Sequence, residues 1–344
     1  MSSAASRADR AEPRAASERR LTVTLSDDIV PLSGNHNLLV AFQFGASPPS
    51  TQHAAIVNPG LESIDGGDIY ECWWYDGEVN VTTCDDVRIA QCEDYAVAIL
   101  QRPDSAPEDF RQTTYDAYHD LLRAVQETEH RHLIKIWNYF AGINDGDDDR
   151  EKYRQFSIGR ADVFEELGIL DETVPTGTAV GSVRDSGLSI IALISKHGLY
   201  AAENPRQVSA FKYPRQYGPR SPKFSRGGCV SIGNHSLFLL SGTAAIIGHE
   251  SVHPYDVSLQ TSETLENLDQ LCKAISGLRS EGPALVLDKE CVLRVYLRDP
   301  GDRVFVAAQL QELLGITESN AVFLHADICR RELMVEVDGV RVLS

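Results

Sequence analysis

An internal repeat limits the possible folds of this chain more than any other pattern in it. Each half contains, in the same order, a helix pattern, an apolar strand, an acidic loop with glycine, a second helix and paired strands. The apolar strand reads "LIKIWNYF" in the first half and "CVLRVYLR" in the second, and the second helix ends in "EELGI" or "ELLGI". This diverged duplication predicts two β-α-β units in one α/β (α+β) chain, with the active site in the cleft between the halves.

Apolar periodicity gives approximate bounds for the repeated elements. The expected helices are 107–129, 150–167, 263–276 and 302–316, and the expected strands include 177–183 and 188–195. The segment from Ser105 to Glu108 fits the capping-box pattern, which predicts the start of the first helix. Near the C-terminus, Asp338-Gly339 between apolar runs predicts the turn of a β-hairpin.

The N-terminal part of the chain is expected to add strands to the first unit. Between residues 21 and 104, segments such as "LLVAFQFG", "YECWWYDGEVNV" and "DYAVAILQ" have strand patterns, and we expect Trp73 and Trp74 in the core. Residues 1–20 are rich in Ala, Ser and Arg and are expected to form a disordered tail. The predicted bounds are 21–200 for the N-terminal unit and 201–344 for the C-terminal unit, which carries most of the active site.

Charge and cysteine content exclude several classes of partner. A formal net charge of -18 repels nucleic acid and anionic membranes over most of the surface. Seven cysteines without a C-x-x-C pair indicate reduced thiols, and the N-terminus lacks the apolar core of a signal peptide. No apolar run is long enough to span a bilayer. We therefore expect a cytoplasmic monomer that acts on a small molecule.

The stretch from Asn204 to His249 contains no Asp or Glu, although these two types make up 50 of the 344 residues. Its first part carries cations interleaved with aromatic residues: Arg206, Lys212, Tyr213, Arg215, Tyr217, Arg220, Lys223, Phe224 and Arg226. An acidic chain that clears carboxylates from one stretch is expected to build a pocket for a small anion there. A solvated basic loop rich in Pro and Gly is the alternative. The segment "FSRGG" lacks the P-loop spacing, which disfavours phosphate transfer.

Two motifs resemble metal sites, but neither has the required context. The segment "HESVH" at 249–253 fits the zinc-protease pattern, which requires both histidines on one helix face. Pro254 follows, and the preceding segment has a strand pattern, so a zinc hydrolase is only an alternative. The acidic loop at 144–150 lacks the last carboxylate of a calcium loop, because Phe156 is at that position. We expect no metal and no cofactor.

The C-terminal strands contain a candidate general acid. Glu332 and Glu336 share a face if both lie in one regular strand. Glu336 is inside "LMVEV", where apolar neighbours would disfavour its charged form and suit an acid near neutral pH. A solvent-facing strand residue is the alternative. Cys329 is either a small core residue or a reactive one.

Several long segments resemble the chorismatases, bacterial enzymes that remove pyruvate hydrolytically from chorismate. They are "WNYFAGIN", "REKYRQFSIGRADVF", "ENPRQVSAFKYPRQYGPRSPKFSRG" and "LFLLSGTAAIIGHESVH". The resemblance extends from Leu21 to the C-terminus. It implies a fold similar to the RidA-like imine deaminases, with two such units in one chain that imitate part of a trimer. It also implies a role in secondary metabolism.

The resemblance assigns roles to particular residues. It implies that Glu336 is the acid that protonates the enolpyruvyl methylene group. Because the substrate is a dicarboxylate, Arg215, Arg226 and Arg160 are the expected carboxylate contacts. Tyr217 is expected to bind the ring hydroxyl or a carboxylate, and Tyr213 is a further substrate-binding candidate.

Chorismatases divide by product, and two positions resemble one branch. Gly242 and Cys329 are similar to the pair of the 3-hydroxybenzoate-forming branch, which is thought to act through an epoxide-like intermediate. The other branch adds water and forms a dihydroxycyclohexadiene carboxylate, and it carries Ala and an aliphatic residue at these positions. A non-catalytic protein that binds a small anion on the same scaffold is a further alternative.

Overall fold

The computed structural model describes residues 20–343 except 33, 49–54, 183–185 and 279–283. The predicted tail lies outside the described residues, apart from Arg20. The first unit consists of β6 (Asn80–Cys84), β7 (Val87–Gln91), β8 (Tyr95–Arg102), α1 (Phe110–Gln126), β9 (His132–Ala141), α2 (Lys152–Glu166), β10 (Thr176–Ser182) and β11 (Leu188–Ser195). The second consists of β12 (Tyr200–Ala202), β13 (Gly227–Ile232), β14 (His235–Ala244), α3 (Val257–Gly277), β17 (Val292–Leu297), α4 (Arg303–Leu314), β18 (Ala321–His325) and β19 (Val335–Leu343).

The two units have the same topology. The six-stranded sheet has the order β10-β9-β11-β8-β7-β6, and the seven-stranded sheet has the equivalent order β18-β17-β19-β14-β13-β12, with β4 (Glu62–Ser63) added beside β18. In each sheet the strand after the first helix pairs in parallel with the strand after the second helix, and the other unit strands pair antiparallel. The predicted repeat is therefore confirmed. It also includes three strands before each first helix, which the sequence pattern did not reveal.

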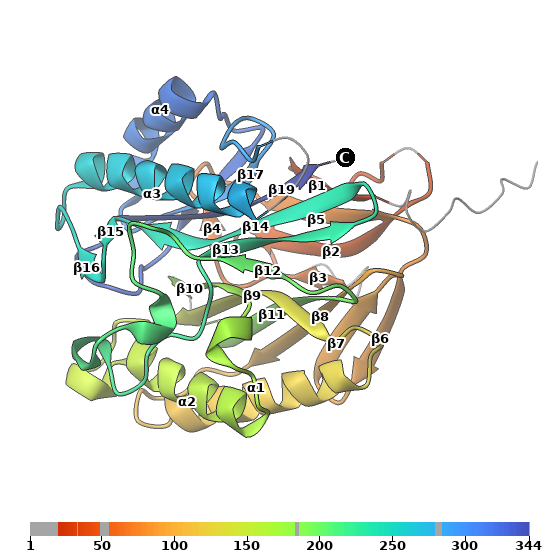
Figure 1. Cartoon of the computed structure of the whole chain (residues 1–344), viewed down its shortest axis with the longest axis horizontal. Coiled ribbons are helices and arrows are strands. Elements are labelled where there is room, and N and C mark those ends of the chain that lie inside the picture. Colours follow the sequence, from red (N-terminus) through yellow and green to blue (C-terminus); the bar gives the residue numbers. More distant parts are fainter. Residues whose placement is uncertain (1–19, 33, 49–54, 183–185, 279–283, 344) are drawn as a thin grey trace, which may run out of the picture.

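The units pack with their sheets facing each other and their helices outside (Figure 1). Helices α1 and α2 cover the outer face of the six-stranded sheet, and α3 and α4 cover that of the seven-stranded sheet. The core between the sheets contains Trp137 and Ile191 from the first unit and Leu239 and Val340 from the second. Functional side chains between the units are consequently held by two rigid sheets.

A third, four-stranded sheet closes one end of this core. It has the order β1-β5-β2-β3 and consists of β1 (Leu21–Ser26), β2 (His36–Phe44), β3 (Ile56–Val57) and β5 (Ile69–Asp76). Trp73 and Trp74 of β5 are buried, which confirms the prediction that they belong to the core. The domain boundary at residue 200 stays a prediction, although β12, which begins there, pairs with β13 of the second unit.

Helix bounds agree with the periodicity except at two N-termini. Helix α1 begins at Phe110, and the Ser105 hydroxyl bonds to Thr113 Oγ1 at 2.8 Å, so the predicted capping box is wrong. Helix α3 begins at Val257 rather than 263, because the Asp256 side chain accepts from the Leu259 N–H and caps it there. Among the described residues, no helix combines the length and apolar character needed to cross a bilayer.

The predicted C-terminal hairpin is wrong. Strand β19 continues through Asp338-Gly339, pairing with β14 on one side and β17 on the other. The Asp338 side chain is buried and accepts hydrogen bonds from the first unit, so it does not turn the chain. Local sequence predicts a turn here, but partners distant in sequence decide the conformation.

Candidate active site

A cavity of about 530 Å³ lies between the two units. Its lining comes from α2 and the preceding loop, β10, the connection between β12 and β13, β14, β15 (Ile246–Ile247), the loop between β18 and β19, and the start of β19. The predicted site residues that line it are Arg160, Tyr213, Tyr217, Arg226, Gly242, Cys329 and Glu336. The structure thus brings together all the predicted site residues except Arg215.

Glu336 on β19 is buried at the floor of this cavity, with 5% of its surface exposed. Among the described residues, its carboxyl group has no hydrogen-bond or ion-pair partner. The pKa of Glu336 is raised to about 8, mainly because the side chain is buried; nearby Asp338 also raises this pKa, while Lys135 and Arg226 partly oppose the increase. Glu336 therefore keeps its proton at neutral pH and has a proton to donate into the cavity.

Gly242 on β14 makes room for the Glu336 carboxyl group. A Cβ atom at this position would lie 2.0 Å from Glu336 Oε1 and 3.3 Å from Thr178 Cγ2. Any larger residue would have to displace the carboxyl group. This close approach explains a glycine within an otherwise apolar strand.

Cys329 and Glu332 lie in the loop between β18 and β19, not in a strand. The predicted shared face of Glu332 and Glu336 is therefore wrong, because β19 begins only at Val335. Both loop residues line the cavity. Burial raises the pKa of the half-buried Cys329 to about 12, so its sulfur stays a thiol.

Arg226 and Arg160 are buried cations that line the cavity. The Arg226 guanidinium donates to Val208 O at 2.9 Å and to Tyr213 Oη at 2.7 Å, whereas Arg160 lies over the Phe156 ring at 4.8 Å. Within the described part of the chain, neither side chain forms an ion pair, and the Nε atom of each lacks a hydrogen-bond partner. Buried guanidinium groups without acids favour an anionic ligand.

Arg215 is not among the residues that line the cavity, so its role as a carboxylate contact stays a prediction. Its exposed guanidinium forms two bonds to Asp149, at 2.9 Å and 2.5 Å. Other cations of the acid-free stretch also pair with carboxylates outside it. The four pairs are Arg206–Glu263, Arg215–Asp149, Arg220–Glu165 and Lys223–Asp171. These pairs attach the stretch to α2, to the turns before and after α2, and to α3. Of the six cations in the stretch, only Arg226 lines the cavity.

Arg330 is a cavity residue that the sequence did not indicate as functional. It donates to His249 O at 2.9 Å and to Ser251 Oγ at 3.0 Å, and its guanidinium lies 3.9 Å from the centre of the Tyr217 ring. The Tyr217 hydroxyl oxygen in turn lies 3.2 Å from His249 Nδ1, within hydrogen-bond distance. Arg154 and Tyr153 of α2 line the cavity as well. Only proximity to Cys329 in the sequence could have indicated Arg330.

The "HESVH" segment does not form a zinc-binding helix. Glu250 and Ser251 form the short strand β16, and His253 has a left-handed backbone with φ 54°. The two histidines therefore do not share a helix face, which contradicts the zinc-hydrolase alternative. In the described ranges, no group of three His, Cys, Asp or Glu side chains is arranged to hold a metal ion.

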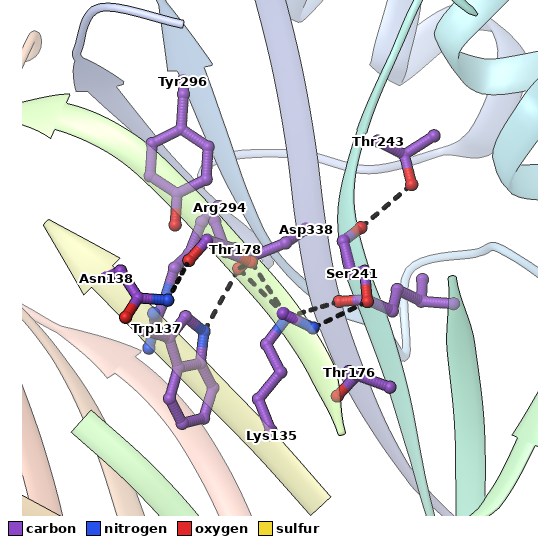
Figure 2. A network of polar contacts seen from close by, with 12 residues as sticks. Lys135, Trp137, Asn138, Thr176, Thr178, Ser241, Thr243, Arg294, Tyr296 and Asp338 are labelled. Carbon is purple, nitrogen blue, oxygen red and sulfur yellow. Dashed lines mark hydrogen bonds and ion pairs between the residues drawn. The ribbon is translucent and has the colours of Figure 1, made fainter. Parts of the chain in front are cut away.

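A buried polar network, which includes the cavity residue Thr178, joins the two units (Figure 2). Lys135 of β9 forms an ion pair of 3.3 Å with Asp338 of β19. Thr178 Oγ1 and Trp137 Nε1 also donate to Asp338 Oδ2, at 2.5 Å and 3.1 Å. Thr178 lines the cavity, so the network connects the reacting space with the interface between the units.

Comparison with known proteins agrees with this arrangement. Residues 71–194 match the family described as Chorismatase FkbO/Hyg5-like, N-terminal. A chorismatase of Streptomyces rapamycinicus is 32% identical over 278 residues, which cover 78% of this chain and 81% of that protein. A 3-hydroxybenzoate synthase of Streptomyces hygroscopicus is 30% identical over 280 residues, which cover 78% of this chain and 80% of that protein.

A solved structure extends the agreement to nearly the whole fold. The crystal structure of a chorismatase covers 94% of this chain and 98% of its own, with a TM-score of 0.83 and 26% identity. The chain belongs to the chorismatase family, which confirms the resemblance found in the sequence.

Proposed function

We propose that this enzyme converts chorismate into 3-hydroxybenzoate and pyruvate. The observation that carries the proposal is Glu336, a buried carboxylic acid whose pKa is raised to about 8. Its cavity is also lined by two buried arginines, Arg160 and Arg226, that form no ion pair with the described residues. Chorismate is a dicarboxylate with an acid-labile enolpyruvyl ether. Its cleavage requires a protonated carboxyl group that can donate a proton to the enolpyruvyl group. It also requires cations that bind the two carboxylates of the substrate.

In the proposed reaction, Glu336 donates its proton to the methylene carbon of the enolpyruvyl group. The ether carbon becomes an oxocarbenium ion, and pyruvate becomes a leaving group. The neighbouring ring hydroxyl attacks the ring carbon that carries the ether, and the electrons of the broken ring C–O bond form the ketone of pyruvate. The hydroxyl proton returns to the Glu336 carboxylate, leaving an epoxide on the ring.

Aromatisation completes the reaction without net consumption of water. The epoxide opens, hydrogen migrates between the two ring carbons, and loss of a proton gives 3-hydroxybenzoate. Chorismate contains the same atoms as the two products together. The rival route, addition of water to give a dihydroxycyclohexadiene carboxylate, consumes one water molecule for each pyruvate.

Two cavity residues favour the route without water. Gly242 lets the Glu336 carboxyl group approach its backbone closely, where a Cβ would lie 2.0 Å from Oε1. The Cys329 thiol lines the same cavity and, with a pKa raised to about 12, acts only as a neutral group during the hydrogen shifts. Arg226 and Arg160 are the proposed carboxylate contacts, with Tyr213 and Tyr217 beside them.

Incubation of the purified protein with chorismate, followed by chromatography of the products, tests the proposal. We expect equal amounts of pyruvate and 3-hydroxybenzoate. Absence of pyruvate would overturn the activity, and recovery of only the non-aromatic diol would overturn the product assignment. The variant Gly242→Ala/Cys329→Val is expected to shift the product towards the diol, and an unchanged product would remove both residues from product control.

A further inference from the structure

The Lys135–Asp338 ion pair lies on the side of β19 from which the Glu336 side chain also projects. Asp338 and Glu336 are two positions apart on β19, so their side chains leave the strand on the same face. Asp338 is 1% exposed, and its Oδ2 atom accepts from Thr178, Trp137 and Lys135. All three donors come from the first unit. Asp338 thus binds three side chains of the first unit through a single oxygen atom.

Lys135 is held away from Glu336 by its own bonding. Its ammonium group lies 2.7 Å from Leu240 O, 3.0 Å from Thr178 Oγ1 and 3.3 Å from Asp338 Oδ2. An ammonium group has three N–H donors, so these three acceptors occupy all of them. Figure 2 shows the ammonium nitrogen between β10, β14 and Asp338. Lys135, which acts on Glu336 through its charge, therefore has no free N–H donor for the Glu336 carboxyl group.

We propose that Asp338 is a positioning residue that keeps Glu336 in its acid form by binding Lys135. If Lys135 were not paired with Asp338, its charge would favour the ionised form of Glu336, which would then have no proton to give. The inference rests on the proposed role of Glu336 as the proton donor. The inference adds a role for Asp338, which does not touch the substrate: by binding Lys135, it helps Glu336 to retain its proton.

Other groups around Glu336 do not replace Asp338 in this role. Arg226, from the connection before β13, acts in the opposite direction and lowers the pKa of Glu336. Cys329 and Tyr153 both have raised pKa values and stay neutral near pH 7. Tyr296, the neighbour of Glu336 on β17, bonds to Tyr139 Oη at 3.2 Å. Among the described groups whose charge acts on Glu336, Asp338 is the only carboxyl group.

The pH dependence of kcat/KM for pyruvate release tests the inference. Because Glu336 must be protonated, activity of the native enzyme is lost as the pH rises through the Glu336 pKa, about 8. This loss of kcat/KM at high pH is the basic limb of the pH profile. In Asp338→Asn, Lys135 is free to attract Glu336, and we expect the midpoint of the basic limb to move down by about one pH unit or more. A basic limb that does not move would overturn the inference.

A second variant gives the opposite shift and covers the case in which Asp338→Asn does not fold. In Lys135→Met the cation is absent, so the basic limb is expected to move to higher pH. No movement, or movement to lower pH, would overturn the inference. A purely structural role would lower kcat or stability in both variants without moving the limb in opposite directions.

Two controls separate this inference from other failures. Glu71→Gln removes a carboxylate from another buried ion pair, with Arg294, that does not contact the cavity, so its basic limb should stay at the native pH. A limb that moves equally in this control would overturn the specific role of Asp338. Glu336→Gln tests the proton donor itself. If that variant is inactive and Asp338→Asn shows no shift, the inference alone fails; if Glu336→Gln is active, the proposed function of Glu336 fails.

Discussion

Within the described part of the chain, two fully buried ion pairs join the sheets, and they differ in what surrounds them. Arg294 and Glu71 form two bonds of 2.7 Å and 2.6 Å, while Lys135 and Asp338 lie 3.3 Å apart. The two pairs are close, since Arg294 and Asp338 are partners across β17 and β19. The rings of Phe42, Phe44 and Trp137 surround the Arg294 guanidinium, with centres at 4.0 Å, 5.4 Å and 4.8 Å. The Lys135 pair instead is bonded to Thr178, which lines the cavity.

The difference separates a structural ion pair from a functional one. Besides binding Glu71, Arg294 donates to Tyr139 at 2.6 Å, and Trp73 donates to Glu71 at 2.8 Å, so no titratable group is left over beside that pair. Next to the Lys135 pair, Glu336 is left unpaired and faces the cavity. We infer that the fully bonded Arg294–Glu71 pair holds the sheets together, and we propose that the unpaired Glu336 carboxyl group is the catalytic acid.

The largest expected effect comes from removing that carboxyl group. Glu336→Gln keeps the shape of the side chain but has no proton to donate, so the rate of pyruvate release should fall about a thousandfold. Binding of a product analogue such as 3-hydroxybenzoate, measured by calorimetry, should stay close to native. Near-native turnover in this variant would shift the acid to another cavity carboxylate, with Glu332 as the first candidate.

Breaking the Arg294–Glu71 ion pair should lower the stability of the fold and leave the reaction rate unchanged. Glu71→Gln leaves Arg294 buried without its counter-ion, which is expected to lower the free energy of unfolding by about 3 kcal/mol or more. Chemical denaturation measures this loss. The kcat of the fraction that remains folded should stay native, and a large fall in kcat would show that the two pairs are not functionally distinct.

Two arginines in the connection between β12 and β13 allow a comparison of substrate binding. Arg226→Met removes a buried cation from the cavity, and KM for chorismate should rise about tenfold or more, since a charge-assisted bond is lost. Arg215→Met removes an exposed cation that pairs with Asp149, and its KM should change less than twofold. Steady-state kinetics on both variants decides which arginine meets the substrate.

The smallest effect concerns stability against pH. Because the folded-state pKa of Glu336 is raised from 4.5 to about 8, its protonation stabilises the fold at low pH, and this contribution is lost as the pH rises through 8. Glu336→Gln does not titrate, so its Tm relative to native should be higher at pH 9 than at pH 5. An equal Tm difference at both pH values would mean that Glu336 is not buried in its acid form.

Much of the fold was predictable because it depends on local patterns repeated twice. Helix and strand periodicity, glycine after α2 and the shared "LGI" ends gave the two units. The apolar setting of Glu336 in the sequence also indicated a raised pKa, beside the alternative of a solvent-facing residue, and the buried position decides between the two. These features depend on neighbours in the chain or on burial alone, which periodicity reports.

The rest depends on partners that are distant in the sequence. Asp338-Gly339 predicts a turn locally, yet the donors that hold Asp338 in a strand come from β9 and β10, in the other half of the chain. Likewise, composition could not separate Arg226 from Arg215, because the counter-ion Asp149 precedes the connection and lies in the first unit. Such pairs become visible only when the units are assembled.

Conversion of chorismate in D₂O, followed by NMR, tests the central claim most directly. If exchangeable Glu336 protonates the methylene carbon, pyruvate must carry one deuteron in its methyl group and appear in equal amount with 3-hydroxybenzoate. Pyruvate without deuterium at early times, or chorismate that stays intact beside its enzyme-free control, would contradict the account.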